Sequence, residues 1–152
     1  MKLLYGAAFC LLLSSPLTFA DKPHHGPKSI EVKVEVGSKD GAMKFFPDKL
    51  SFERGNYYKL VISNPSEHEH YFTSDAFSTH IFTRKIEVKN ASGKTIAEIH
   101  GAVTDMELKP GSQVEWYFFP MTKGKNLRLY CHKKGHEALG MVGSIDITGN
   151  MK

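Results

Sequence analysis

The sequence predicts an all-β protein, a Greek-key β-sandwich with an extra middle section. Apolar and polar residues alternate with a period of two through most of the chain, which is typical of strands with one buried face. Turn signals such as Arg54-Gly55-Asn56, Asn64-Pro65 and Pro110-Gly111 separate these segments. Their spacing of roughly ten residues is typical of a sandwich, and Greek-key connections are the usual way to link such a series of strands.

The expected strands follow one another along the chain. Alternating apolar residues place strands over 30–36, 50–52, 58–62, 114–118, 127–131 and 145–147. The segment 75–84 alternates poorly, and we expect a short helical turn there between strands. Residues 85–108 form the rest of the extra middle section, with further strands and turns at 90–93 and near Gly101.

The N-terminal residues have the layout of a targeting segment. Lys2, an apolar run over 3–13 and the small residues Thr18 and Ala20 predict a secretory signal peptide over 1–20, which directs the protein to the periplasm. A polar, flexible, histidine-containing lead-in covers 21–28, and the folded domain covers 29–152. No second apolar stretch is long enough to cross a bilayer, so we expect a protein that does not span the membrane.

Composition excludes some partners and narrows the role of the cysteine. The 152-residue chain carries a formal net charge of +4, which falls to +3 once Lys2 leaves with the leader. With no dense run of Lys or Arg, the sequence argues against nucleic acid as a partner. Loss of Cys10 leaves Cys131 without a disulfide partner, so its thiol is either buried and inert or bound to a metal.

The C-terminal segment places three soft donors at regular spacing. Cys131, His136 and Met141 are each separated by four residues, and Cys131 shares an inward face with Leu127 and Leu129. A loop after Cys131 would return His136 and Met141 to the sulfur. A thiolate, an imidazole and a weak thioether select copper over hard cations, and zinc would prefer a stronger fourth ligand.

A second imidazole has to come from elsewhere in the chain. The segment after the strand at 58–62 offers His68 and His70, which lie on one face of an extended segment. Periodicity does not choose between the two histidines.

Taken together, these motifs resemble the cupredoxin family, small β-sandwich proteins with a type 1 copper site. The similarity covers residues 29–149 and rests on several motifs: Phe46-Pro47, Leu50, Phe52, Gly55, Tyr58, Leu108 to Gly111, Trp116, Cys131, Gly135-His136 and Gly140 to Gly143. The six-residue step from Asn64 to His70 resembles the first ligand loop of the family and favours His70 over His68. Tyr71 and the middle section 75–108 depart from the family pattern.

The resemblance implies a ligand set and a fold. One copper ion, cycling between Cu(I) and Cu(II), would be held by His70, Cys131 and His136 in a trigonal arrangement, with Met141 as a long axial ligand. The folded domain would then be a cupredoxin domain. Asn64 and backbone amides near Cys131 are candidates for the hydrogen bonds that hold these ligands.

Other residues with metal or charge chemistry have ordinary interpretations. We expect His132 to point outward, His80 and His100 to be solvated or hydrogen-bonded, and Met121 to pack in the core or in a loop. His24 and His25 are either a solvated linker or a flexible copper-capturing pair. A third group either forms a basic rim that steers an acidic partner or is ordinary surface charge: Lys123, Lys125, Lys133 and Lys134.

The function expected from this site is one-electron transfer by a monomeric periplasmic protein. The exposed edge of His136, flanked by Ala138 and Leu139, would meet a redox protein partner. The alternative is a copper-tolerance protein that sequesters or hands on periplasmic copper. We do not expect an enzyme, because a single fully ligated copper leaves no open position for substrate.

Overall fold

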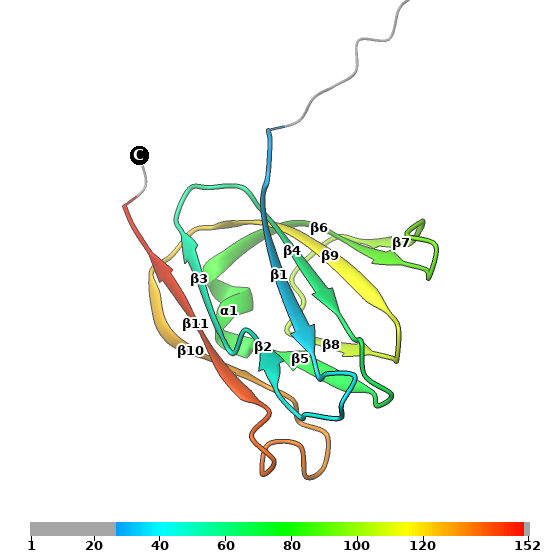
Figure 1. The fold of residues 1–152 in the computed structure, drawn as a ribbon. Coiled ribbons are helices and arrows are strands. Elements are labelled where there is room, and N and C mark those ends of the chain that lie inside the picture. The colour runs from blue at the N-terminus through cyan, green and yellow to red at the C-terminus, as the bar shows by residue number, and fades with distance from the viewer. Residues whose placement is uncertain (1–26, 151–152) are drawn as a thin grey trace, which may run out of the picture.

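The computed structural model describes residues 27–150 as two β-sheets packed face to face (Figure 1). The expected signal peptide and all but the last two residues of the lead-in lie outside the described residues. A β-sandwich of this kind confirms the predicted fold class.

The first sheet has six strands and contains a parallel pair. Its order is β2 (Phe45–Phe46), β1 (Ile30–Val36), β4 (Tyr58–Ser63), β9 (Gln113–Pro120), β6 (Ile81–Lys89) and β7 (Thr95–Ile99). β1 pairs with β4 in parallel and the other neighbours are antiparallel. β7 is an edge strand whose five residues are all exposed.

The second sheet has five strands and supplies most of the site. Its order is β3 (Lys49–Glu53), β11 (Val142–Thr148), β10 (Gly124–Tyr130), β5 (His70–Thr73) and β8 (Asp105–Leu108). β3 pairs with β11 in parallel. Parallel pairs join strands that are distant in the sequence, so both sheets depend on long-range contacts.

The core lies between the sheets and is rich in aromatic rings. Alternate residues of β9 are buried, among them Trp116 and Phe118. The short helix α1 (Asp75–His80) adds Phe77, whose ring lies 5.5 Å from Trp116 and 5.2 Å from Phe118, with near-perpendicular planes. Such edge-to-face contacts are favourable for aromatic rings.

The middle section contains α1, β6, β7 and β8, as the sequence analysis expected, but β6 begins earlier than its pattern indicated. Residues 81–84 already belong to β6. The register with β9 shifts between Thr83 and Lys85, so Arg84 is an extra residue in the strand. A bulge of this kind breaks the alternation, which explains the weak sequence pattern there.

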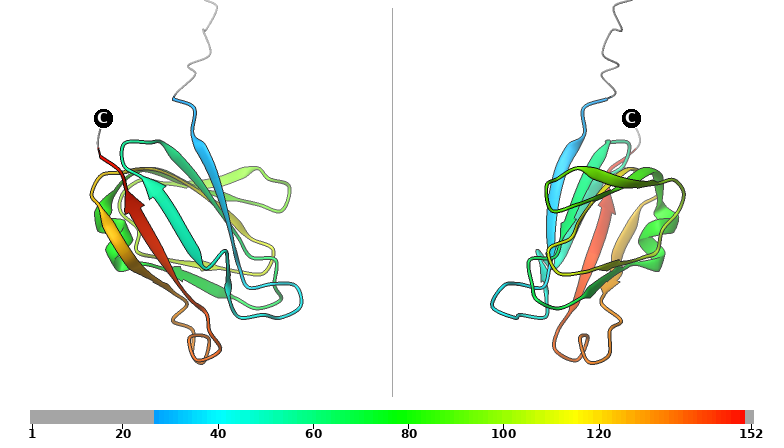
Figure 2. Two further views of the ribbon diagram at one scale, coloured as in Figure 1. Left: turned by 60° about the vertical axis from the view of Figure 1, so that its left-hand side comes forward. Right: turned by 90° about the vertical axis from the view of Figure 1, so that its right-hand side faces the viewer.

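The strand ends determine where the site lies. β4 ends and β5 begins at the same end of the sandwich as the loop after β10, whereas the chain enters β1 at the opposite end (Figure 2). Among the described residues, no helix has the length and apolarity needed to cross a bilayer.

Candidate metal centre

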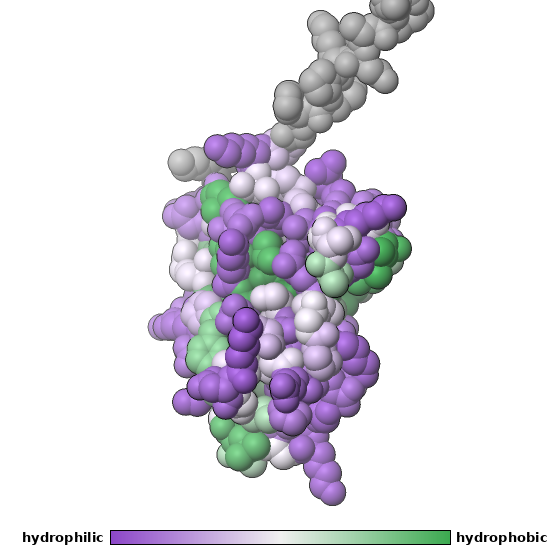
Figure 3. Space-filling view, turned by 45° about the vertical axis from the view of Figure 1, so that its right-hand side comes forward, coloured by the Kyte–Doolittle hydropathy of each residue, from purple (hydrophilic) through white to green (hydrophobic). Residues whose placement is uncertain are grey.

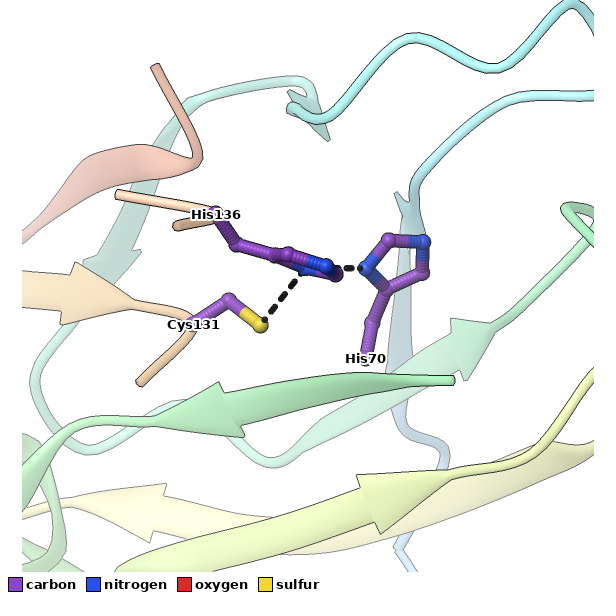
Figure 4. A group of neighbouring side chains, drawn as sticks. All are labelled: His70, Cys131 and His136. Atoms are coloured by element: carbon purple, nitrogen blue, oxygen red, sulfur yellow. Dashed lines mark hydrogen bonds between the residues drawn. The ribbon is translucent and has the colours of Figure 1, made fainter. Parts of the chain in front are cut away.

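Three of the predicted ligands converge at one end of the sandwich. Nδ1 of His136 lies 3.2 Å from Nδ1 of His70 and 3.4 Å from Sγ of Cys131 (Figure 4). All three donor atoms lie within 4.8 Å of one another, the spacing of a group that can hold one metal ion. His70 and Cys131 are fully buried, and His136 is 8% exposed.

The loop after β10 is closed by its own backbone. The amide of Met141 donates to the carbonyl of His136 at 3.0 Å, and the carbonyl of Met141 accepts from the amide of Cys131 at 3.2 Å. Gly135 and Gly140 have positive φ angles, +87° and +94°, which let the loop turn back sharply. Met141 is fully buried and is bonded through its backbone to both neighbouring ligand residues.

Of the two histidines that sequence periodicity could not separate, His70 enters the group. It is the first residue of β5, and its register partner on β8 is Leu108. His68 lies in the loop before β5 and is exposed. The two do not share a strand, because the extended conformation begins only after His68.

A hydrogen-bonded chain behind His70 indicates which of its ring nitrogens is free. Both amide hydrogens of Asn64 are directed at carbonyls, those of His68 at 2.7 Å and Leu108 at 2.8 Å. Its Oδ1 therefore accepts, and the hydroxyl of Ser66 donates to it at 2.7 Å. Oγ of Ser66 is then the acceptor for Nε2 of His70, 2.9 Å away.

This arrangement places the imidazole proton on Nε2 and leaves the lone pair on Nδ1, which faces Cys131 and His136. Asn64 was recognisable from the sequence as a candidate for this role, whereas Ser66 was not. The pair forms an Asx turn, in which the amide of Ser66 donates to Oδ1 of Asn64 at 3.0 Å. An Asn at a strand end with Ser two residues later is a local signal that could have identified it.

Gly37, at the end of β1, supports the same imidazole from behind. Its φ is +77°, and a Cβ built on it would lie 2.4 Å from Nε2 of His70 and 3.0 Å from Oγ of Ser66. Only glycine allows the backbone to approach this closely. Sequence analysis gave no indication of this contact, because β1 and β5 are distant in the chain.

The sulfur of Cys131 accepts a backbone hydrogen bond. The amide of Tyr71 donates to Sγ at 3.3 Å. This bond holds the sulfur in place, facing the two imidazoles of the group. The side chain of Tyr71 takes no part in that bond and lies against the ring of His132, with centroids 4.0 Å apart. The unusual residue after His70 therefore leaves the backbone contact intact.

The imidazoles of His70 and His136 are neutral near pH 7. Burial, with the nearby imidazole of His136, lowers the pKa of His70 from 6.5 to about 4. Burial, with the charge of Lys133, also lowers the pKa of His136. Neutral imidazoles can bind a metal ion without first losing a proton. Lys133 in turn lies 2.6 Å from Glu69, whose pKa falls to about 2 beside Lys109 and Lys133.

Most of the remaining expectations from the sequence agree with the structure. His132 is exposed, with Nε2 3.1 Å from Asp105. Nδ1 of His80 lies 2.6 Å from the carbonyl of Ala76, and Nε2 of His100 lies 2.9 Å from Glu98.

The structure decides between two pairs of alternatives that the sequence left open. Met121 is 42% exposed and follows β9, so it is a loop residue and not part of the core. Lys123 and Lys125 flank the start of β10, the end away from Cys131, so the four lysines do not form one rim, and only Lys133 and Lys134 remain beside the ligand loop. Seven residues of extended chain place the two lysine pairs about 20 Å apart.

The donor set fits copper. One sulfur and two imidazole nitrogens in a buried group, beside the buried thioether residue Met141, suit a soft or borderline ion and not a hard one. A model of copper-binding proteins of the plastocyanin/azurin family matches residues 32–148.

The chain belongs to the plastocyanin/azurin family of copper-binding proteins.

Solved structures agree with this cupredoxin assignment at the level of the fold. Auracyanin from Roseiflexus castenholzii is 15% identical, with a TM-score of 0.51 over 80% of this chain and 98% of auracyanin. A multicopper oxidase from Campylobacter jejuni is 20% identical, with a TM-score of 0.58 over 84% of this chain. A copper nitrite reductase from Thermus scotoductus is 12% identical, with a TM-score of 0.53 over 78%.

This cupredoxin spans 31% of each of those two enzymes. A search of curated protein sequences found no match. The family and the donor set fit a single type 1 copper site.

Proposed function

We propose that this cupredoxin is a periplasmic one-electron carrier whose copper is held by His70, Cys131, His136 and Met141. The observation that carries the proposal is the buried convergence of the first three side chains within 4.8 Å. Copper bound there would supply reversible one-electron chemistry.

Rigid support of the ligands favours electron transfer. His70 is fixed by Ser66 and by the close approach of Gly37, and the sulfur of Cys131 is fixed by the amide of Tyr71. Ligands that keep their positions when the charge of the metal changes lower the reorganisation energy of electron transfer. A preformed set of donor atoms also reduces the ordering needed when copper binds.

The surface around His136 offers a docking face for a redox partner. Leu139 is 63% exposed and Val142 is 44% exposed, and the amide of Leu139 donates to the carbonyl of His136 at 3.2 Å. Figure 3 shows an apolar patch at this lower end of the molecule. An apolar face beside the least buried ligand would let a partner approach the metal closely without strong binding.

We propose no enzymatic activity, because one cysteine, two histidines and one methionine would fill the coordination positions of a single copper. A role in copper tolerance remains the alternative use of the same site. Its other support, the pair His24 and His25, lies outside the described residues.

The ligand assignment is tested by the visible spectrum of the Cu(II) protein. A thiolate bound to Cu(II) gives strong visible absorption, so Cys131→Ser should abolish the band, whereas Met141→Gln should keep copper and shift both colour and potential. His70→Ala should damage the site far more than His68→Ala. A coloured Cys131→Ser variant would show that the sulfur is not a ligand.

The carrier role is tested by stopped-flow oxidation of the reduced protein with ferricyanide. Leu139→Glu places a negative charge beside His136 and should slow this anionic oxidant. Ile96→Glu on β7 is the matched control, because Ile96 is 62% exposed and Leu139 63%. Equal slowing by both substitutions would contradict electron entry at His136. Copper-sensitive growth of a deletion strain, with no loss of electron transfer, would favour tolerance instead.

A further inference from the structure

The end of the sandwich opposite the copper site carries exposed apolar and basic side chains from both sheets. We call this region the far-end surface and define it by Arg54, Phe82, Met121, Lys123 and Lys125. Arg54 joins its parts, since its Nε donates to the carbonyl of Met121 at 2.9 Å and its amide donates to the carbonyl of Thr148 at 3.0 Å.

Its apolar part consists of two protruding side chains. Phe82 is 58% exposed and Met121 is 42% exposed. Phe82 is the register partner of Phe119, and Met121 directly follows β9, with its amide donating to the carbonyl of His80 at 2.8 Å, so both residues lie where β6 begins and β9 ends. Ile30, 48% exposed, lies at the same end, where the described chain enters β1.

Its basic part borders an open hollow. Lys123 and Lys125 are exposed and line the hollow together with Asp146 and Thr148. Within residues 27–150 neither lysine forms an ion pair, whereas Asp146 already lies 3.7 Å from Lys49 and accepts the amide of Asn126 at 2.7 Å.

Glu53 also lies at this end, and the hydrogen bond that it accepts from Asn56 at 3.2 Å leaves its negative charge in place. Because Asp146 lies beside Lys49, three basic groups, Arg54, Lys123 and Lys125, stand against the single carboxylate of Glu53, and the net charge of this end is positive.

We propose that the far-end surface rests on an anionic phospholipid bilayer. Basic side chains attract acidic headgroups, and exposed apolar side chains beside them can enter the boundary between headgroups and acyl chains. Charge attraction and apolar insertion both lower the free energy of binding to such a membrane, so a surface that has both binds more strongly than a surface with one of them.

The arrangement of the chain supports a membrane as the occupant. The described chain begins at this end, where the amide of Ile30 donates to the carbonyl of Tyr57 at 2.8 Å (Figure 2). β10 runs from this end to Cys131, about 20 Å away. A molecule resting on its far-end surface would present His136 and Leu139 away from the bilayer, free for a redox partner.

The test is co-sedimentation of the copper-loaded protein with lipid vesicles. The chain is used without residues 1–20, so that its apolar leader cannot insert, and every strand lies within the residues retained. Vesicles containing phosphatidylglycerol are compared with vesicles of phosphatidylcholine alone. We expect binding to the anionic vesicles only, weakened by salt.

Matched variants distinguish binding through the far-end surface from non-specific binding to the vesicles. Phe82→Ser and the double reversal Lys123→Glu, Lys125→Glu should each lower binding by about tenfold or more. The controls act at the copper end, where Leu139 lies in the ligand loop and Lys39 and Lys44 are exposed in the loop between β1 and β2. Leu139→Ser and the double reversal Lys39→Glu, Lys44→Glu should bind as the unmodified protein does.

Three results would overturn the proposal. These are no binding to anionic vesicles, equal losses in the control variants, or sensitivity to the lysine reversals without sensitivity to Phe82→Ser. The last pattern would mean that the lysines attract the vesicles by charge alone, with no insertion of apolar side chains. The spectrum of the copper site, recorded for every variant, shows separately whether the proposed function holds.

Discussion

Ser66→Ala is the sharpest test of how the protein prepares its histidine ligand. Ser66 is 4% exposed, and its Oγ lies 2.9 Å from Nε2 of His70. Copper at Nδ1 requires the ring proton on Nε2, and in the variant that proton has no acceptor. Without copper the ring can move its proton to Nδ1, which lies 3.2 Å from Nδ1 of His136. The penalty therefore falls on the copper-bound state.

Its size follows from the cost of an unsatisfied buried donor, about 1–3 kcal/mol. We expect copper affinity to fall roughly 5- to 150-fold, measured by competition with a chelator of known affinity. Both Cu(I) and Cu(II) need the same tautomer, so the midpoint potential should change little.

The matched control is Ser74→Ala. Ser74 is 2% exposed and donates to the carbonyl of Arg128 at 2.6 Å, so its loss also leaves a buried polar group unpaired, but outside the site. It should lower the free energy of unfolding and leave copper affinity unchanged. Unchanged affinity in Ser66→Ala, or an equal loss in Ser74→Ala, would refute the tautomer argument.

Three further predictions address the site and its support. Gly37→Ala should weaken copper binding by at least about tenfold, because its Cβ would lie 2.4 Å from Nε2 of His70. Gly41→Ala is the control and should leave copper affinity unchanged, since Gly41 has a similar φ of +86° but open space around it. Equal affinities of the two variants in a chelator titration would exclude the contact between Gly37 and His70. The depressed pKa of His70, from 6.5 to about 4, means that the unfolded chain takes up the proton first, so the copper-free protein should keep full stability above about pH 6.5 and lose it as the pH falls toward 4. Urea unfolding should show this loss diminished in His70→Gln, and identical curves at about pH 7 and about pH 4.5 would contradict it. Phe77→Ala should lower the free energy of unfolding by about 3–5 kcal/mol, because Phe77 is fully buried. Phe82→Ala should lower it by less than about 0.5 kcal/mol, because Phe82 is 58% exposed. Comparable losses in thermal or urea unfolding would show that Phe77 is not a core residue.

The fold class was predictable because strand alternation is a local property. The buried face of β9 appears in the sequence as Val114, Trp116 and Phe118. The pattern failed where geometry interrupted it: the bulge at Arg84 shifted the register of β6, and no single-sequence periodicity reveals a register shift.

The sequence by itself determined the donor types and their spacing after β10, because Cys131, His136 and Met141 lie within one loop. The resemblance to cupredoxins separated His70 from His68, and the structure shows the physical difference, since one begins a strand and the other lies exposed in a loop.

Only the tertiary structure decided how those ligands are held and which end of the molecule carries which surface. Ser66 and Gly37 reach His70 through contacts between strands far apart in the sequence. Lys123 and Lys133 appear as neighbours of one loop in the sequence, yet β10 separates them by about 20 Å. The physical reason is the geometry of β-structure. An extended strand separates in space residues that are close in the sequence, and pairing between strands brings together residues that are far apart in the sequence.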